Sequence, residues 1–158
     1  MSTYSKILIP IDFSEYSQEA LRQACDLGRR FDSELHLIHV LHSVTPAGKT
    51  TTEFRPLHES IVAGWKEEAE QKLDKLPDAS MGPKRVDRKV IFGNPALEIV
   101  NYADAHGIDL IVMGTHGRTG FKAWMAGSVA ERVVRFAHCP VLVVRPKSDV
   151  QSGTTQPV

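Results

Sequence analysis

Cysteine is scarce in this chain, which has only Cys25 and Cys139 among its 158 residues. Each lies in an apolar stretch, and two cysteines far apart in sequence do not make the disulfide framework of a small secreted domain. The polar N-terminal residues also lack the charged and then apolar layout of a secretory signal. We therefore expect two reduced thiols in a cytoplasmic protein, with a disulfide between them as the less favoured alternative.

Net charge and long apolar runs are also missing. The 19 Lys and Arg residues balance 19 Asp and Glu residues, so the chain lacks the electrostatic footprint of a dedicated nucleic-acid binder. Aromatic residues make up only 7% of it, and they are not interleaved with basic residues as a base-stacking platform would require. No apolar run reaches the roughly 18 residues of a membrane span. We expect neither a nucleic-acid partner nor membrane insertion.

What the chain does contain is an alternation of strand-like and helix-like segments. Its length corresponds to about one domain, which we place at residues 1–146, followed by a polar tail, 147–158, that is expected to be disordered. Short apolar runs predict buried strands, and a 3.6-residue periodicity predicts helices. The segment 42–56, rich in Ser, Thr, Pro and Gly, predicts a long loop. The predicted strands are 6–11, 35–41, 85–92, 109–113 and 140–145, and the predicted helices are 15–31, 57–76, 128–137 and one that starts at Pro95.

Apolar spacing predicts which faces of two helices pack inward. The helix that starts at Pro95 has a good N-cap in Asn94 and a good first residue in the proline. Its expected inward stripe consists of Leu97, Ile99, Val100 and Ala103. In the helix 57–76, the expected stripe recurs every four residues and consists of Ile61, Trp65, Ala69 and Leu73.

Five strands alternating with four helices predict an α/β fold, a doubly wound parallel sheet with helices on both faces. In such sheets, ligands bind beyond the carboxyl ends of the strands, where the strand order reverses. The first predicted strand leads into Asp12, and the fourth leads into Gly114. We therefore expect these two strand ends to share a binding crevice.

A glycine-rich connection follows the fourth predicted strand. Gly114, Gly117 and Gly127 precede Ser128, the expected N-cap of the next helix. Glycine permits positive φ and close approach of a ligand, and the free N–H groups at a helix start attract anions. The glycine spacing alone is a weak signal, and Ser128 with Glu131 also forms a capping box. We interpret the segment as a phosphate cradle, with a purely structural cap as the alternative.

Polar side chains near this crevice each have a functional and a structural interpretation. Asp12 could accept a hydrogen bond from a ribose hydroxyl or from adenine, or it could be a turn residue ahead of Ser14. Arg118 and Lys122 could neutralise the charge of a phosphate, or they could be loop residues whose charges are solvated. His116 is interpreted as a loop residue rather than a catalytic base. The sequence has no Walker A or G-x-G-x-x-G motif, no nucleophile and base at recognisable spacing, and no metal-ligand spacing, so no catalytic or metal-binding residue is assigned.

Three stretches together resemble the universal stress protein family. They are Ile-Pro-Ile-Asp-Phe-Ser at 9–14, the G-x2-G-x9-G-S pattern at 114–128, and Cys-Pro-Val-Leu-Val-Val at 139–144. The resemblance implies an adenine nucleotide alpha hydrolase-like fold, a five-stranded parallel sheet in the order 3-2-1-4-5, and homodimers formed by the last strand, here Val141 to Val144. Because the chain keeps the glycine pattern, the resemblance also implies the subgroup that binds ATP.

The same resemblance implies binding positions around ATP. Asp12 would lie near the ribose and adenine, with Pro10 and Ile11 beside it, and Val40 would hydrogen-bond adenine through its backbone. Phosphates would be bound by N–H groups and the serine hydroxyl of Gly127, Ser128 and Val129. The ribose and phosphates would be surrounded by Met113, Gly114, Thr115, His116, Gly117, Arg118, Thr119 and Gly120.

Together these features predict an ATP-binding regulatory or stress-response homodimer whose nucleotide state controls contact with a partner. Mg²⁺ is expected to accompany the triphosphate. Hydrolysis of ATP is expected to be slow at most, because no base that would activate a water is visible. Two alternatives stay open: a nucleotide-free docking module that regulates a transporter or another protein, and an enzyme that transfers phosphoryl or adenylyl groups in the same crevice.

Overall fold

The computed structural model describes residues 4–42, 55–115 and 129–147. The strands and helices of these residues alternate as the sequence predicts, with ends that differ slightly from the predicted ones. Most of the predicted 42–56 loop and of the predicted tail lies outside the described residues. In chain order, the elements are β1 (Lys6–Pro10), α1 (Glu15–Phe31), β2 (Glu34–His42), α2 (Arg55–Asp74), β3 (Val86–Gly93), α3 (Pro95–His106), β4 (Leu110–Gly114), α4 (Val129–Phe136) and β5 (Val141–Val144).

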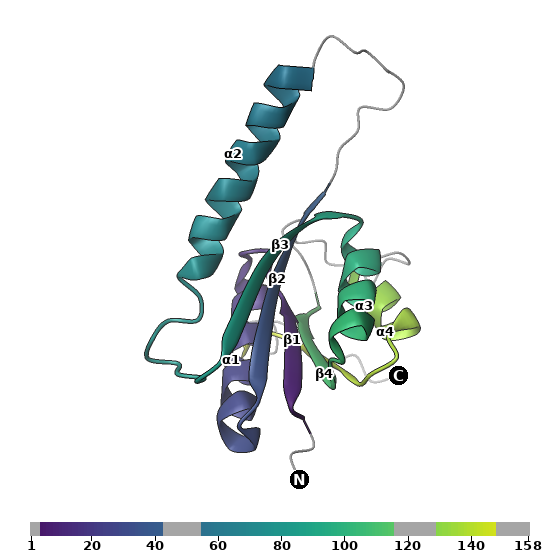
Figure 1. Ribbon diagram of the computed structural model, residues 1–158. Helices are drawn as coiled ribbons and strands as arrows, with labels where there is room; N and C mark the ends of the chain where they lie inside the picture. Colours follow the sequence, from purple (N-terminus) through teal and green to yellow (C-terminus); the bar gives the residue numbers. More distant parts are fainter. Residues whose placement is uncertain (1–3, 43–54, 116–128, 148–158) are drawn as a thin grey trace.

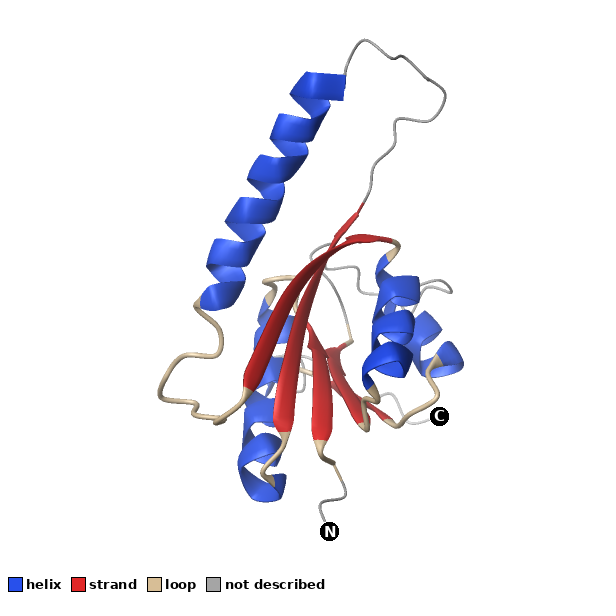
Figure 2. Cartoon of the chain, viewed as in Figure 1, coloured by secondary structure: helices blue, strands red, loops and turns tan. Residues whose placement is uncertain are grey.

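The strands form one five-stranded sheet in the order β3-β2-β1-β4-β5 (Figure 2). Each neighbouring pair is parallel, so β1 lies at the centre, and β3 and β5 form the edges. The predicted α/β class, the parallel pairing and the order 3-2-1-4-5 are therefore confirmed.

Helices cover both faces of the sheet (Figure 1). The side chains of α1 and of the last turns of α2 pack on one face, and those of α3 and α4 pack on the other. Consecutive residues of β1 alternate between these two cores: Ile7 and Ile9 face α1, whereas Leu8 faces α3, and all three are fully buried. A strand buried on both faces is continuously apolar for this reason.

Side-chain caps start the helices α1 and α3 at the carboxyl ends of the preceding strands. The Ser14 Oγ accepts a hydrogen bond from the Ser17 N–H at 3.3 Å. The Asn94 Oδ1 likewise accepts from the Leu97 N–H at 3.3 Å. The Asn94 cap was predicted, and both caps satisfy N–H groups that the first helical turn leaves without intrahelical partners.

The inward stripe predicted for α2 is wrong in its first half. Ala69 and Leu73 are buried, but Ile61 is 47% exposed and Trp65 is 54% exposed. Figure 1 shows the reason: the first turns of α2 extend past the end of the sheet, so no strand lies beneath them. Periodicity gives the direction in which side chains point, but it does not show whether anything covers them.

The stripe predicted for α3 is only partly correct: Ile99 and Ala103 are buried as predicted. Leu97 is 54% exposed, and Val100 is only half-buried. The buried positions lie at helical spacing on one face of the helix: Ala96, Ile99, Tyr102 and Ala103.

Three further observations concern the edge strand β3, the two cysteines and the helix lengths. The first half of β3 alternates half-buried and exposed positions, with Asp87 and Lys89 exposed, which is typical of an edge strand. Cys25 and Cys139 are both free thiols and pack against opposite faces of the sheet. Within the three described ranges, no helix is both long enough and apolar enough to cross a membrane.

Candidate functional site

The carboxyl ends of β1 and β4 lie side by side at the point where the strand order reverses. The chain leaves β1 for α1 on one face of the sheet, whereas the helix after β4 lies on the opposite face. Diverging connections leave a crevice between two such strands, and ligands of open α/β sheets bind there. The structure thus brings Asp12 and Gly114, the two strand ends predicted to share a crevice, to the same edge of the sheet.

The turn from β1 into α1 holds the Asp12 carboxylate in a defined orientation. Its Oδ1 accepts hydrogen bonds from the Ser14 N–H at 2.9 Å and from the Ser14 Oγ at 2.5 Å. Ser14 is at the same time the N-cap of α1. Both bonds use Oδ1, so the turn does not occupy the second carboxylate oxygen. Asp12 therefore fulfils its structural interpretation as a turn residue and remains suited to accept a hydrogen bond from a ligand.

Residues from β2 and α2 pack against this turn. Phe13 adopts a positive φ of 63°, an uncommon conformation for a bulky residue that costs about 1 kcal/mol and persists only where packing enforces it. Its ring packs on His39 with centroids 4.7 Å apart, and the Lys72 Nζ lies 5.8 Å from its centroid. The His39 Nδ1 lies 2.6 Å from the Ile11 carbonyl oxygen. Neither Phe13 nor His39 is among the predicted site residues, although a histidine near the end of an apolar strand was a usable signal.

Gly114 has a packing requirement of its own. A Cβ built on Gly114 would lie 2.7 Å from the Tyr16 Cβ and 2.9 Å from the Tyr16 carbonyl carbon and oxygen. The first turn of α1 therefore approaches the end of β4 so closely that only glycine fits. This contact explains the first glycine of the motif without any ligand.

β1 lies beside β2 but ends before it reaches Val40. The backbone of Val40 points toward this open side of β2. The Leu35 N–H donates to the Arg85 carbonyl toward β3, whereas the Ile38 carbonyl accepts from the Ile11 N–H toward β1. Alternate residues of a parallel strand bond to opposite neighbours. Val40 is two residues beyond Ile38, so its N–H and carbonyl point toward the space beyond β1. A backbone donor and acceptor in this position suit a planar heterocycle, as predicted for adenine.

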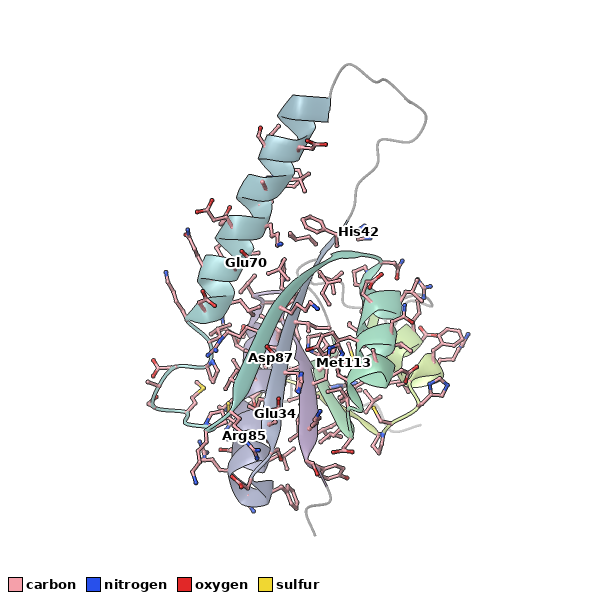
Figure 3. The ribbon with its side chains drawn as sticks, viewed as in Figure 1. Glu34, His42, Glu70, Arg85, Asp87 and Met113 are labelled. Carbon is pink, nitrogen blue, oxygen red and sulfur yellow. The ribbon has the colours of Figure 1, made fainter. Side chains whose placement is uncertain are left out.

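The other predicted site residues divide into two groups. Ile11 and Met113 are buried, and Met113 packs in the core on the α3 side (Figure 3), so they offer backbone rather than polar side chains. The Thr115 N–H donates to the Val144 carbonyl at 3.2 Å, and Val129 is the first residue of α4. The predicted residues that lie outside the described ranges are His116, Gly117, Arg118, Thr119, Gly120, Gly127 and Ser128.

A separate buried polar cluster lies toward the amino-terminal ends of the strands. The His36 Nδ1 lies 2.9 Å from the Tyr102 hydroxyl, and its Nε2 lies 3.4 Å from the Glu34 Oε1. Burial lowers the pKa of His36, and burial together with the neighbouring Asp87 raises the pKa of Tyr102 to about 12. Figure 3 shows Glu34 and Asp87 far from His42, which marks the carboxyl end of β2, so this cluster is not part of the crevice. No group of metal-ligating side chains suited to an ion occurs in the part of the chain that the structure describes.

The fold defines a doubly wound α/β protein with a parallel sheet, and comparisons identify its family. The model of the universal stress protein family matches residues 3–145. The universal stress protein MJ0531 of Methanocaldococcus jannaschii is 40% identical over 147 residues, which cover 92% of this chain and 85% of that protein. The solved structure of MJ0577 from the same organism superposes with a TM-score of 0.78 at 32% identity, covering 92% of this chain and 98% of that one. The chain belongs to the universal stress protein family.

Two further solved structures share the fold and contain an adenine mononucleotide. A universal stress protein of Archaeoglobus fulgidus was solved in complex with dAMP, with a TM-score of 0.62 at 24% identity, covering 90% of this chain and 99% of that one. Another universal stress protein was solved in complex with cAMP, with a TM-score of 0.63 at 20% identity, covering 89% of this chain and 96% of that one. At these identities the likeness shows the shared fold.

Proposed function

We propose that this protein binds ATP in the crevice between β1 and β4 and acts as a regulatory, stress-response homodimer whose nucleotide state controls contact with a partner. The observation that carries the proposal is the convergence of the oriented Asp12 carboxylate with the outward-pointing backbone of Val40 at the switch point. A carboxylate oxygen suits a ribose hydroxyl, and a backbone donor with a neighbouring acceptor suits adenine. The adenine mononucleotides in two proteins of the same fold support this choice of ligand.

The rest of the proposed site follows the predicted positions. The segment from Gly114 to Gly120 and the start of α4, at Gly127, Ser128 and Val129, would bind the phosphates through N–H groups, and Mg²⁺ would accompany them. Arg118 would neutralise phosphate charge with its planar guanidinium. The proposal concerns binding rather than turnover. The free thiols on opposite faces of the sheet fit a cytoplasmic protein.

Homodimerisation through β5 has a physical reason in the sheet. Among the described residues β5 pairs with β4 alone, so the backbone groups on its second side have no strand partner there. The strand carries no charged residue that would discourage pairing, unlike β3, and Leu142 is 40% exposed. An apolar edge strand of this kind tends to pair with another chain. We propose that two copies pair through Val141 to Val144.

The hydrogen-bond pattern of β5 allows a selective test of this dimer. The Pro140 carbonyl accepts a bond from the Ile111 N–H of β4, and the Val144 carbonyl accepts one from the Thr115 N–H just beyond β4. The backbone of Val143 therefore points outward. Val143→Pro removes an outward N–H while sparing the bonds to β4, and edge strands tolerate proline. Sedimentation velocity at micromolar concentration should show a dimer for the original protein and a monomer for this variant. A monomeric original protein would refute the proposed interface.

Nucleotide binding is tested first on the purified protein itself. Heat-released material from freshly purified protein should contain an adenine nucleotide, identified by chromatography. Calorimetry on stripped protein should then show saturable binding of ATP with Mg²⁺ and much weaker binding of GTP, which lacks the amino group of adenine. Protein that emerges empty, and whose Tm does not change in millimolar ATP with Mg²⁺, would refute the proposal and favour the nucleotide-free docking module. Rapid release of phosphate or diphosphate in the same assays would instead favour a transfer enzyme.

A further inference from the structure

The two buried histidines of β2 lie on opposite faces of the sheet and have different surroundings. Side chains alternate along a strand, so His36 points to the α3 side, where it contacts Tyr102. His39 points to the side of α1 and α2, where it contacts the β1–α1 turn. Only His39 therefore reaches the crevice end of β1.

The contact between His39 and Ile11 defines which atom donates the hydrogen bond. A carbonyl oxygen only accepts hydrogen bonds, so the His39 Nδ1, 2.6 Å from the Ile11 carbonyl oxygen, must carry a proton and donate it. Ile11 is 3% exposed, and a buried carbonyl without a partner would be costly. The imidazole therefore supplies a hydrogen bond that the site needs.

This hydrogen bond replaces a bond of the sheet. The bond between the Ile11 N–H and the Ile38 carbonyl, at 2.8 Å, is part of the parallel ladder between β1 and β2. The next bond of a regular ladder would join the Val40 N–H to the Ile11 carbonyl. Within the described residues, that carbonyl accepts from His39 instead. Because the Ile11 carbonyl accepts from His39, the ladder of backbone hydrogen bonds between β1 and β2 ends one bond early. The Val40 N–H then faces the crevice.

We infer that His39 is a positioning residue for the nucleotide: its imidazole takes the place of the Val40 N–H on the Ile11 carbonyl, so that Val40 can donate to the base and the turn carrying Asp12 is held apart from β2. This inference rests on the proposed function, since it concerns the same crevice. The Phe13 ring packs over the imidazole and limits its rotation. Supporting side chains of this kind keep contact groups in a productive geometry without touching the ligand themselves.

Three variants separate positioning from general stability. His39→Leu removes the donor but fills a similar volume, and His39→Asn restores an N–H near the position of Nδ1. His36→Leu is the matched control, because it removes a buried histidine of the same strand on the opposite face. Calorimetry with ATP and Mg²⁺ should show affinity weakened about tenfold in His39→Leu, the size of one hydrogen bond. His39→Asn should recover most of this loss, and His36→Leu should bind within about twofold of the original protein even where its Tm falls.

Amide exchange measured by NMR gives a second readout that needs no nucleotide. In the stripped original protein, the Val40 amide should exchange at least about a hundredfold faster than the Ile38 amide, which lies inside the ladder. In His39→Leu the Val40 N–H can bond to the Ile11 carbonyl, so amide exchange at Val40 should slow. Equal protection of Val40 and Ile38 in the original protein would overturn the inference whether or not ATP binds.

The two hypotheses fail in different ways. If the original protein binds ATP and His39→Leu binds it equally well, the positioning role is wrong and the proposed function stands. If His36→Leu weakens binding as much as His39→Leu, the effect is general destabilisation, and the inference is again overturned. If the original protein binds no nucleotide while Val40 still exchanges fast, the proposed function is wrong, and the backbone role of His39 is retained without a nucleotide.

Discussion

Gly114→Ala should destabilise the nucleotide-free protein, because the structure has no room for a Cβ at this position. The added Cβ would lie 2.7 Å from the Tyr16 Cβ and 2.9 Å from two backbone atoms of the same residue. Distances below 3.0 Å are essentially never seen for real Cβ atoms. Since two of these neighbours are backbone atoms in the first turn of α1, rotating a side chain cannot relieve the clash. Either α1 or β4 must move.

The size of the effect follows from the cost of overpacking. Inserting a methyl group into a well-packed site typically costs about 1–3 kcal/mol. For a domain of this length, 1 kcal/mol corresponds to a change in Tm of about 2–4 °C. A cost of about 2 kcal/mol therefore predicts that Tm falls by roughly 4–8 °C. Thermal unfolding of stripped protein, followed by circular dichroism, measures this change.

Gly64→Ala is the matched control, with an expected effect of opposite sign. Gly64 lies inside α2, and a Cβ there meets no atom within 4 Å. Alanine should therefore raise the free energy of unfolding by about 0.5–1 kcal/mol, because it has the higher helix propensity. If Gly114→Ala melts at the original temperature and loses only nucleotide affinity, then Gly114 is needed by the ligand, and the argument from Tyr16 is refuted.

Three other measurements test particular side chains. Asp12→Ala should weaken ATP binding in calorimetry without loss of the folded circular dichroism spectrum, and unchanged affinity would remove Asp12 from the proposed site. Burial lowers the pKa of His36 in the folded protein. In the unfolded chain this histidine has the usual pKa of about 6.5, so as the pH falls the unfolded chain takes up a proton before the folded protein does. The free energy of unfolding in urea should thus decrease as the pH falls from about 6.5 toward the depressed folded pKa and then level off. His36→Asn should flatten this part of the curve, and parallel curves for the two proteins would contradict the assignment. Cys25 is 1% exposed, and burial raises the pKa of its thiol to about 11. An alkylating reagent at about pH 8 should therefore modify Cys25 only as fast as the protein unfolds. Modification at the rate of an unfolded control would show that the thiol is accessible.

The order of the elements was predictable because each is encoded by neighbouring residues. The apolar run of β1, the caps Ser14 and Asn94, and Pro95 at the start of α3 act within one or two turns of chain. Alternating strands and helices then lead to a parallel sheet, since the crossovers between parallel strands are right-handed. The position of the crevice at the ends of β1 and β4 follows from the same topology.

Burial was less predictable where periodicity allows more than one outcome. Leu97 has helical spacing, but the face of α3 that packs on the sheet contains Ala96 and Tyr102 instead. Trp65 continues the stripe of Leu73, but the sheet ends before the helix does. Both errors have one cause. Helical spacing shows which side chains share one face of a helix, but the surface that covers this face comes from other parts of the chain.

The amino-acid sequence by itself determined the strands, the helices and the caps, because apolar periodicity and short-range hydrogen bonds are properties of local sequence. The order of the strands in the sheet was predicted only through the resemblance to the universal stress protein family. Only the tertiary structure decided that Gly114 must make room for Tyr16 and that His39 donates to Ile11, a residue 28 positions away. Such contacts depend on how separate elements pack against one another, and their distances of a few ångströms are set by the assembled core rather than by any one segment.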